Sequence, residues 1–402
     1  MAQLLAVDRA LAQILSKSEC SQTIDRLPIL EACGRVLAES VVSSIDVPPL
    51  DNSAMDGYAL RHADLGRGAL AVSQRIAAGQ VGEPLQPGSA ARIFTGAPIP
   101  PGADTVVMQE DTERDGDTIT ITEQAIVRGQ HVRPKGQDID KGREVLAAGH
   151  RLKPQDIGVL ASIGAAHVLV YRPLTVAVIS TGDELVEPGQ PLAQGQIYNS
   201  NRFMLSALLQ SLGCEVIDGG IIADDFASTA QQLSLLATQA DVLISSGGVS
   251  VGEEDHVKAV VESLGELSLW KLNIKPGKPV AFGQVAETPF FGLPGNPASS
   301  LVTFCLLARP YLLKAMGQTE VAPLTISAKA AFDTAKSGTR QEYLRARISY
   351  RNGEAWVERY NNQSSGVLMS TSWANALAVI EPGTAVQQGD SLAVLLLSEL
   401  LH

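Results

Sequence analysis

The sequence predicts a multidomain α/β protein whose central domain is a doubly wound, mostly parallel sheet. Its 402 residues are enough for roughly two to three domains at about 150 residues each. Residues 174–318 alternate apolar, β-branched runs with amphipathic helical segments, a pattern typical of a parallel sheet covered by helices on both faces. Residues 46–138 differ, because they hold short β-type runs separated by Gly and Pro.

Helical patterns precede this β-rich region and return after it. Apolar residues recur at helical spacing from Ala6 to Leu15, and Pro28 to Ser40 is predicted to form a second helix. The segment "RLKPQDIGVLASIGAA" predicts another helix, with a proline in its first turn and a glycine near its end. We therefore expect a β-rich domain, residues 46–138, inserted into a helical linking domain formed by residues 1–45 and 139–173.

In the central domain the predicted elements follow one another as in a wound sheet. Their predicted order is strand Leu174–Ile179, helix Ser200–Leu212, strand Cys214–Ile222, helix Ala227–Gln239, strand Asp241–Ser245 and helix Glu254–Leu264. Further strands are expected near Leu267 and Val280, and a helix from Ala298 to Met316 closes the domain. Residues 319–402 contain "RQEYLRARISY", "AWVERY" and "SLAVLLLS", which predict a small, barrel-like β domain at the C-terminus.

Composition limits the classes of partner. The chain has 31 Lys and Arg against 43 Asp and Glu, a formal net charge of -12, which argues against nucleic acid and anionic membranes as partners. The N-terminus lacks signal-peptide features, and no apolar run approaches the roughly 18 residues of a membrane span. The four cysteines lack metal-site spacing and are interpreted as isolated thiols. We therefore expect a cytoplasmic protein.

Acidic residues follow three of the predicted strands, in the segments "STGDEL", "ADD" and "SSGGVSVGEED". Ligands of open α/β sheets bind beyond the carboxyl ends of the strands. One acid at such a place commonly complements a helix dipole, but three clusters at one edge favour a Mg²⁺ site, since no His or Cys joins them. The residues concerned are Ser180, Thr181, Gly182, Asp183, Glu184, Asp224, Asp225, Gly247, Gly248, Gly252 and Asp255.

The glycine-rich segment also fits the G-x-S-x-G pattern of hydrolases, with Ser250 at its centre. That fold requires an acid and a histidine farther downstream, whereas only His256 and His402 follow. We therefore interpret the glycines as a tight strand-to-helix turn whose N–H groups can approach an anion.

Two later segments carry groups suited to an anion. "WKLNIKPGKP" contains Lys271, Lys275 and Lys278, which form either a solvated turn or an anion-binding trio. "GLPGNPASS" places Asn296 as an N-cap and Pro297 at the first helical position, so that free N–H groups face outward. With the acids, these groups describe a site for a small polyanion held partly by cationic side chains and partly by a metal.

Three loops of the inserted region are rich in polar residues: "PPLDNSAMDGYA", "RIFTGAPIPPGADTVVMQED" and "RPKGQDI". From composition alone, each is better explained as a turn than as a site.

Together these segments resemble one known family. "DNSAMDGYA", "TGAPIPPGADTVVMQED", "STGDEL", "SSGGVSVGEED", "KPGKP" and "GLPGNPASS" closely resemble motifs of the molybdopterin molybdenumtransferases (the MoeA family), to which the E domain of gephyrin is similar. The motifs occur in the family's order and cover most of residues 46–316. The resemblance implies that the central domain is of the molybdopterin-binding type.

The resemblance also implies an activity, the final step of molybdenum cofactor biosynthesis. Molybdate is inserted into adenylated molybdopterin and AMP is released, with Mg²⁺ or a similar divalent cation. It assigns metal and phosphate binding to Glu184, Asp224 and Asp255, and further catalytic positions to Asp56, Thr95, Asp138, Lys271 and Lys275. The implied substrate-binding positions are Ser180, Thr181, Gly182, Asp183, Gly247, Gly248, Gly252, Lys278, Pro294, Gly295, Asn296, Pro297, Arg345 and Ser365.

In the family, residues of the inserted domain reach the cleft of a partner subunit, which implies a homodimer. Partner proteins of cofactor biosynthesis are also expected. Two alternative functions of the same fold stay open: a dimeric scaffold or binding module of the gephyrin type, and a molybdopterin adenylyltransferase, which resembles the central domain alone. The full acidic and lysine set disfavours the scaffold, and the additional domains disfavour the adenylyltransferase.

Overall fold

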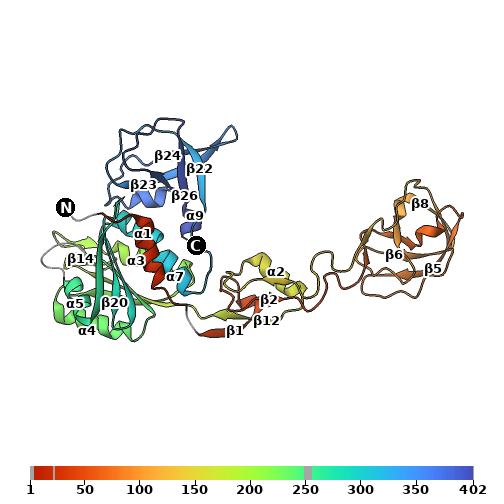
Figure 1. The fold of residues 1–402 in the computed structure, drawn as a ribbon, viewed down its shortest axis with the longest axis horizontal. Helices are drawn as coiled ribbons and strands as arrows, with labels where there is room; N and C mark the ends of the chain where they lie inside the picture. Colours follow the sequence, from red (N-terminus) through yellow and green to blue (C-terminus); the bar gives the residue numbers. More distant parts are fainter. Residues whose placement is uncertain (1–3, 21–22, 249–255, 402) are drawn as a thin grey trace.

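The structure, a computed structural model, describes residues 4–20, 23–248 and 256–401. The molecule is elongated, with the central and C-terminal domains at one end, the inserted domain at the other and the linking domain between them (Figure 1). The predicted multidomain α/β organisation is confirmed. Among the described residues, no helix has the length and apolar character needed to cross a bilayer.

The central domain contains a six-stranded sheet in the order β16-β13-β17-β21-β20-β18. β13 pairs in parallel with β16 and β17, and β17 pairs in parallel with β21, whereas β20 pairs antiparallel with β21 and β18. The sheet is therefore mostly parallel, as predicted. The strands are β13 (Thr175–Thr181), β16 (Glu215–Ile222), β17 (Val242–Ser246), β18 (Gly265–Lys271), β20 (Pro279–Val285) and β21 (Thr288–Leu293).

Helices cover both faces of this sheet. Val176 and Val178 of β13 belong to the same core cluster as α1, α3, α6 and α7, whereas the alternate residues Ala177 and Ile179 pack with α4 and α5. This alternation follows from the two-residue period of a strand. The helices are α1 (Val7–Ser16), α3 (Ser200–Ser211), α4 (Phe226–Ala237), α5 (His256–Leu264), α6 (Pro297–Thr303) and α7 (Arg309–Ala315), with the π-helical segment Phe304–Ala308 joining the last two.

The linking domain contains less helix than predicted. The helix expected at Pro28–Ser40 is wrong: only Ile29–Glu31 forms a 3-10 turn, and Val36 and Leu37 make β-bridges to Arg151 and Val170. These long-range pairings override the local helical pattern. The elements of this domain are β1 (Ile24–Pro28) paired with β12 (His167–Tyr171), β2 (Val41–Val42) paired with β11 (Glu144–Leu146), and α2 (Pro154–Ser162).

The inserted domain contains a six-stranded sheet in the order β7-β4-β6-β5-β9-β8. Its strands are β4 (Gly57–Leu60), β5 (Leu70–Ile76), β6 (Ser89–Ile93), β7 (Thr105–Met108), β8 (Thr112–Asp115) and β9 (Thr118–Ile121), and β3 (Asn52–Ser53) pairs separately with β10 (Val132–Arg133). β7 confirms the prediction made from "DTVVMQ", and β9 confirms the one made from "DTITIT".

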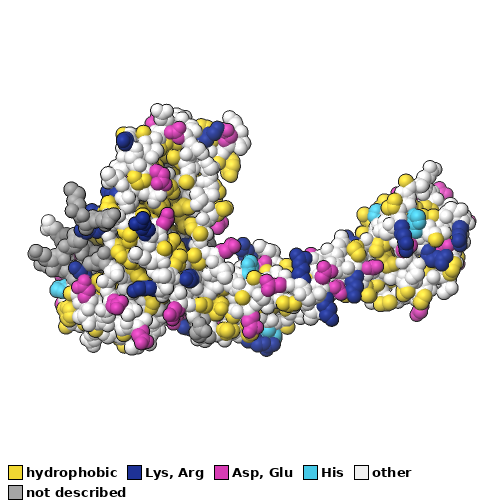
Figure 2. Space-filling view, viewed as in Figure 1, with side chains coloured by type: hydrophobic (Ala, Val, Ile, Leu, Met, Phe, Trp, Pro, Cys, Tyr) yellow, Lys and Arg dark blue, Asp and Glu magenta, His cyan; other side chains and the backbone are white. Residues whose placement is uncertain are grey.

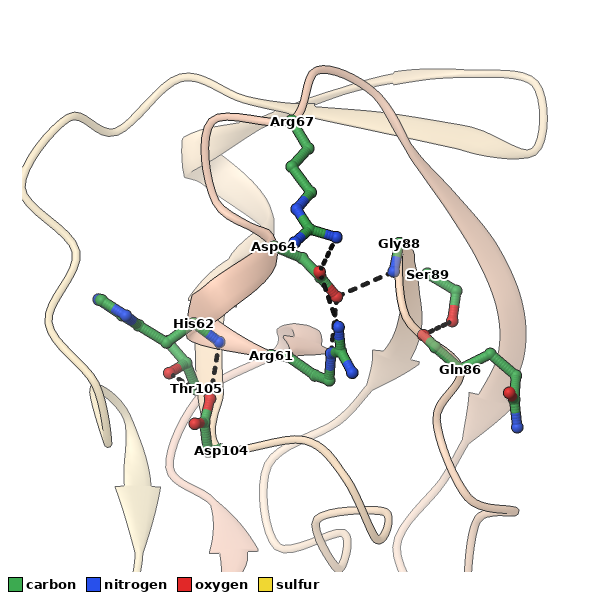
Figure 3. A network of polar contacts seen from close by, with 9 residues as sticks. All are labelled: Arg61, His62, Asp64, Arg67, Gln86, Gly88, Ser89, Asp104 and Thr105. Atoms are coloured by element: carbon green, nitrogen blue, oxygen red, sulfur yellow. Dashed lines mark hydrogen bonds and ion pairs between the residues drawn. The ribbon is translucent and has the colours of Figure 1, made fainter.

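A buried carboxylate fixes one end of the inserted domain (Figure 3). Asp64 accepts hydrogen bonds from Arg61 Nε at 2.8 Å and from the backbone N–H of Gly88 at 2.9 Å, and Arg67 lies 3.0 Å away. These donors, with Arg61 first, lower the pKa of Asp64 to about 2. The aspartate therefore joins the turn after β4 to the turn before β6.

The C-terminal domain is a closed barrel, which confirms the prediction. β23 pairs with both β24 and β25, and the ring continues through β22 and β26. The strands are β22 (Thr325–Ala330), β23 (Gln341–Arg351), β24 (Glu354–Arg359), β25 (Ala376–Ile380) and β26 (Ser391–Leu396), with the short helices α8 (Met369–Trp373) and α9 (Leu397–Leu400). β19 (Ile274–Lys275), from the central domain, pairs in parallel with β23.

Acidic and basic side chains are interspersed along the linking and inserted domains on the face shown in Figure 2. On that face, the charges therefore do not form the basic stripe that nucleic-acid binding favours.

Candidate functional site

A cavity of about 730 Å³ lies at the carboxyl ends of β13, β17 and β21. This is the place where open α/β sheets bind ligands. Its walls come from four loops and from the pair formed by β14 (Leu185–Val186) and β15 (Ile197–Tyr198). The lining residues are Ser180, Thr181, Glu184, Leu185, Ile197, Tyr198, Asn199, Ser200, Asn201, Ser246, Gly247, Gly248, Pro279, Pro294, Gly295, Asn296, Pro297, Ser299, Gly366 and Leu368.

The cavity gathers predicted site residues from three separate segments. "STGDEL" contributes Ser180, Thr181 and Glu184, and the glycine-rich segment contributes Gly247 and Gly248. The third segment contributes four consecutive residues, Pro294, Gly295, Asn296 and Pro297. The structure therefore brings together, in one cavity, residues that lie more than a hundred positions apart in the sequence.

Two glycines allow these loops to approach closely. At Gly248 φ is +69°, and a Cβ would lie 2.5 Å from Cγ2 of Val257 and 2.8 Å from Oγ1 of Thr181. At Gly182 φ is +140°, and a Cβ would lie 2.5 Å from Oε2 of Glu184. Side chains are strained in both conformations, so these positions need glycine. Gly182 and Asp183 form the turn that carries Glu184 to the cavity.

The predicted carboxylate set comes together only in part. Glu184 lines the cavity and is exposed, whereas Asp224, at the end of edge strand β16, is not among the lining residues. Gly252 and Asp255 lie outside the described residues. Among the residues that the structure describes, no group of three or more His, Cys, Asp or Glu side chains could hold a metal. The Mg²⁺ site stays a prediction.

None of the three predicted lysines is among the lining residues of the cavity. Lys271 ends β18 and Lys278 precedes β20, whose first residue, Pro279, does line the cavity. Lys275 lies in β19, where its Nζ is 3.2 Å from Oε1 of Glu342. Lys275 therefore connects the central domain to the barrel.

The C-terminal barrel supplies one wall. Gly366 and Leu368 line the cavity, and the neighbouring Ser365 accepts a hydrogen bond on its carbonyl from the N–H of Ala298 at 3.0 Å. The first turn of α6 is thus only partly open to a ligand. Asn296 occupies the predicted N-cap position, although within the described residues its side chain makes no capping bond.

Arg345 supports this wall from inside the barrel. It is only 1% exposed and is not among the lining residues. Its guanidinium donates to the Ser370 hydroxyl and to the Ser364 carbonyl, both at 3.0 Å. Burial lowers the pKa of Arg345 to about 10. In this conformation the residue predicted to bind substrate holds the loop that forms the wall.

The predicted residues of the inserted domain lie apart from the cavity. Oδ1 of Asp56 accepts hydrogen bonds from the N–H and the hydroxyl of Thr95, both at 2.8 Å, and the backbone bond is the main cause of a lowered Asp56 pKa. Asp138 is exposed between β10 and β11, and its N–H donates to the carbonyl of Val47 at 3.0 Å. None of the three lines the cavity, because their domain lies at the opposite end of the molecule from the central domain (Figure 1).

Several residues of the cavity wall were not predicted from the sequence, among them the polar residues Tyr198, Asn199 and Asn201. Their signal is the segment "YNSN" before α3, where asparagine is typical of an N-cap. Asn199 does occupy that position and accepts from the N–H of Arg202. A second cavity, of about 970 Å³ between the linking domain and the barrel, contains none of the predicted site residues.

Three family models match consecutive parts of the chain. The MoeA N-terminal region (domain I and II) matches residues 5–164, the probable molybdopterin binding domain matches residues 177–314, and the MoeA C-terminal region (domain IV) matches residues 327–397. The predicted resemblance is confirmed along nearly the whole chain.

Relatives and a solved structure agree with these matches. A molybdopterin molybdenumtransferase of Haemophilus influenzae is 43% identical over 384 residues, which cover 94% of this chain and 95% of the relative. One from Nostoc is 37% identical over 396 residues, covering 95% and 91%. The crystal structure of the molybdopterin biosynthesis MoeA protein of Pyrococcus horikoshii has a TM-score of 0.84 at 30% identity and covers 98% of this chain and 100% of that one. The chain therefore belongs to the molybdopterin molybdenumtransferase (MoeA) family.

Proposed function

We propose that this protein is a transferase of molybdenum cofactor biosynthesis that inserts molybdate into adenylated molybdopterin and releases AMP. The observation that carries the proposal is the cavity at the carboxyl ends of β13, β17 and β21, into which three predicted motifs converge. Relatives that match nearly the full chain are named molybdopterin molybdenumtransferase, and that name supports this substrate class.

The walls of the cavity suit a phosphate-bearing substrate. Gly247 and Gly248 bring a strand-to-helix turn close to the end of β13, and backbone N–H groups in such turns bind oxyanions. The hydroxyl of Thr181 adds a donor at the same edge. Lys271 pairs with the lining residue Pro279, Lys278 precedes it in the chain, and both cations would stabilise negative charge on the phosphate and molybdate oxygens.

The available donors also fit a divalent cation. Mg²⁺ is commonly bound by one or two carboxylates together with substrate phosphates and water, and Glu184 offers an exposed carboxylate in the cavity. Glu184 would hold the ion, and Asp255 and Asp224 are proposed to assist. When bound, the ion would polarise the phosphate anhydride as a Lewis acid. Titration calorimetry with Mg²⁺ and AMP should show weaker metal binding for Glu184→Gln and unchanged binding for Glu287→Gln, whose side chain lies in the distant β20–β21 turn.

We also propose that the active enzyme is a homodimer in which the Asp56–Thr95 pair and Asp138 of one chain complete the cavity of the other. Two observations together support this dimer. The resemblance assigns these residues to the active site, yet their domain lies far from the cavity of their own chain (Figure 1).

One assay tests the insertion activity. The purified protein is incubated with adenylated molybdopterin and Mg²⁺, with and without molybdate, and AMP and the finished cofactor are measured. We expect AMP release that depends on molybdate, and Asp255→Ala should abolish it while the protein stays folded and dimeric. Formation of adenylated product from ATP and molybdopterin would instead favour the adenylyltransferase. If neither reaction occurs, the proposed activity is contradicted and the scaffold function is favoured.

A further inference from the structure

One wall of the cavity contains groups that phosphate binding leaves unexplained. It is formed by consecutive residues at the junction of β15 and α3, where Ile197 and Tyr198 line the cavity and remain 55% and 44% exposed. The Tyr198 hydroxyl donates to the carbonyl of Gln190 at 2.9 Å, and β15 is paired with β14. The ring is therefore held in place before a ligand arrives.

The next residue offers a hydrogen-bond donor. Asn199 is 2% exposed. Its Oδ1 accepts from the hydroxyl of Ser180 at 3.3 Å and from the N–H of Arg202 at 3.4 Å, which fixes the orientation of the amide. Its Nδ2 is buried and has no hydrogen-bond partner within the described part of the chain.

Asn201 offers the complementary acceptor. This residue is 8% exposed, and its Nδ2 donates to the Ser246 hydroxyl at 2.8 Å and to the Gly295 carbonyl at 2.6 Å. Its Oδ1 has no partner among the residues described. A buried polar group without a partner is unfavourable, so two complementary groups of this kind in one cavity wall point to a ligand that satisfies them.

From these observations we infer that the wall formed by Ile197, Tyr198, Asn199 and Asn201 is the subsite for a planar heterocycle of the substrate. The ring of the ligand stacks on Tyr198, because aromatic side chains stack on planar bases of any kind. Its edge, which carries a donor beside an acceptor, pairs with the free amide groups of the two asparagines. None of the four side chains is charged, so this wall suits the uncharged ring rather than a phosphate.

The inference rests on the proposed function, because adenylated molybdopterin contains two heterocycles of this chemistry. Both a pterin and an adenine have a donor beside an acceptor on one edge. The experiment therefore uses 6-hydroxymethylpterin and AMP as separate probes, with pyrophosphate as a probe that has no ring. Dissociation constants are measured by fluorescence for the pterin and by calorimetry for the other two.

Tyr198→Ala is compared with Tyr198→Phe, which keeps the ring and loses only the bond to Gln190. For the alanine variant we expect binding of at least one ring probe to weaken by roughly tenfold, with pyrophosphate unchanged. The phenylalanine variant should stay within about twofold of the parent protein, since exposed hydrogen bonds contribute little. Whichever probe is affected identifies the ring that occupies the subsite.

Asn201→Ala supplies an independent arm, and circular dichroism verifies that it is folded. It should weaken the same ring probe and leave pyrophosphate unchanged. Unaltered binding of both ring probes by Tyr198→Ala and Asn201→Ala would overturn the inference, and so would an equal loss for pyrophosphate, which would indicate a purely structural role. These binding measurements need no turnover. If the protein releases no AMP but the variants still lose binding of a ring probe, the proposed function is contradicted. The inference about the subsite is then still supported.

Discussion

Ala298 donates its backbone N–H to the carbonyl of Ser365 at 3.0 Å, which joins the first turn of α6 to a loop of the C-terminal barrel. Arg345 holds the same loop from inside the barrel through Ser364 and Ser370. Since Gly366 and Leu368 of this loop line the cavity, the shape of the cavity depends on contacts that begin within another domain.

Replacing Arg345 should therefore affect both stability and substrate binding. Arg345→Met removes two hydrogen bonds from a charged, buried donor, and we expect a loss of about 2 kcal/mol in the free energy of unfolding. The released loop should also raise the KM for adenylated molybdopterin. Arg347→Met is the matched control on the same strand, because Arg347 donates to the Trp373 carbonyl at an exposed position. Equal effects of the two substitutions would contradict this role for Arg345.

Gly248→Ala should distort the cavity. The new Cβ would meet Val257 and Thr181 inside van der Waals contact, in a backbone conformation that disfavours side chains, at a cost of roughly 1–3 kcal/mol. We expect weaker AMP binding and a lower melting temperature. Gly366→Ala is the control, because there a Cβ finds only Oδ1 of Asn296, at 4.0 Å. If Gly248→Ala binds AMP as tightly as the parent protein, AMP binding does not require this conformation of the loop.

Asp64 should make the stability of the inserted domain depend on acid. Its pKa of about 2 in the folded protein lies below the value of about 3.9 in an unfolded chain. The carboxylate therefore adds stability that is complete above about pH 4 and is lost as the pH falls towards 2. Asp64→Asn should unfold more easily at pH 6 and show a shallower decline between pH 4 and pH 3, measured by thermal melts. The exposed Asp115→Asn should match the parent protein, and an unchanged decline in Asp64→Asn would assign the acid sensitivity elsewhere.

The proposed dimer predicts complementation between inactive variants. Asp56→Ala and Glu184→Gln should each reduce AMP release strongly when purified alone. When the two are unfolded together and refolded, mixed dimers contain one cavity in which both residues are intact, so a substantial part of the activity should return. Mixing without subunit exchange is the control. If refolded mixtures remain inactive, the two residues do not act on the same cavity across a dimer.

The sequence predicts the centre of the wound sheet well because β13 and β17 are runs of mostly apolar residues buried on both faces. β21 was missed because "TPFFGL" is short and contains Pro and Gly, although Phe290 and Phe291 are fully buried. The helix expected at Pro28–Ser40 fails for a different reason. Val36 and Leu37 gain more from bridging distant strands than from a local helical turn, and such pairings have no local signal.

Site residues could be predicted where a motif lies at the end of a strand. They could not be predicted where the position of the side chain depends on contacts with distant parts of the chain. Ser180, Gly247 and Asn296 meet because the ends of parallel strands share one edge of the sheet. By contrast, nothing local indicates that Arg345 is buried behind the wall, or that Lys275 pairs with Glu342 across two domains. Asn201 falls inside the predicted helix Ser200–Leu212 and Tyr198 just before it, and neither carries a local signal for ligand binding because that role depends on the cavity beyond them.

The pairing of β19 with β23 implies that the barrel and the central domain do not fold as independent units. Ile274 is fully buried there, and Tyr343, Leu377 and Leu395 of the barrel share one apolar core with α1 and α3. A chain cut near residue 319 would present an open strand edge and a wide apolar face to solvent. Such a fragment should self-associate. Insertions or deletions at this junction should therefore make the protein aggregate even where they leave the catalytic residues unchanged.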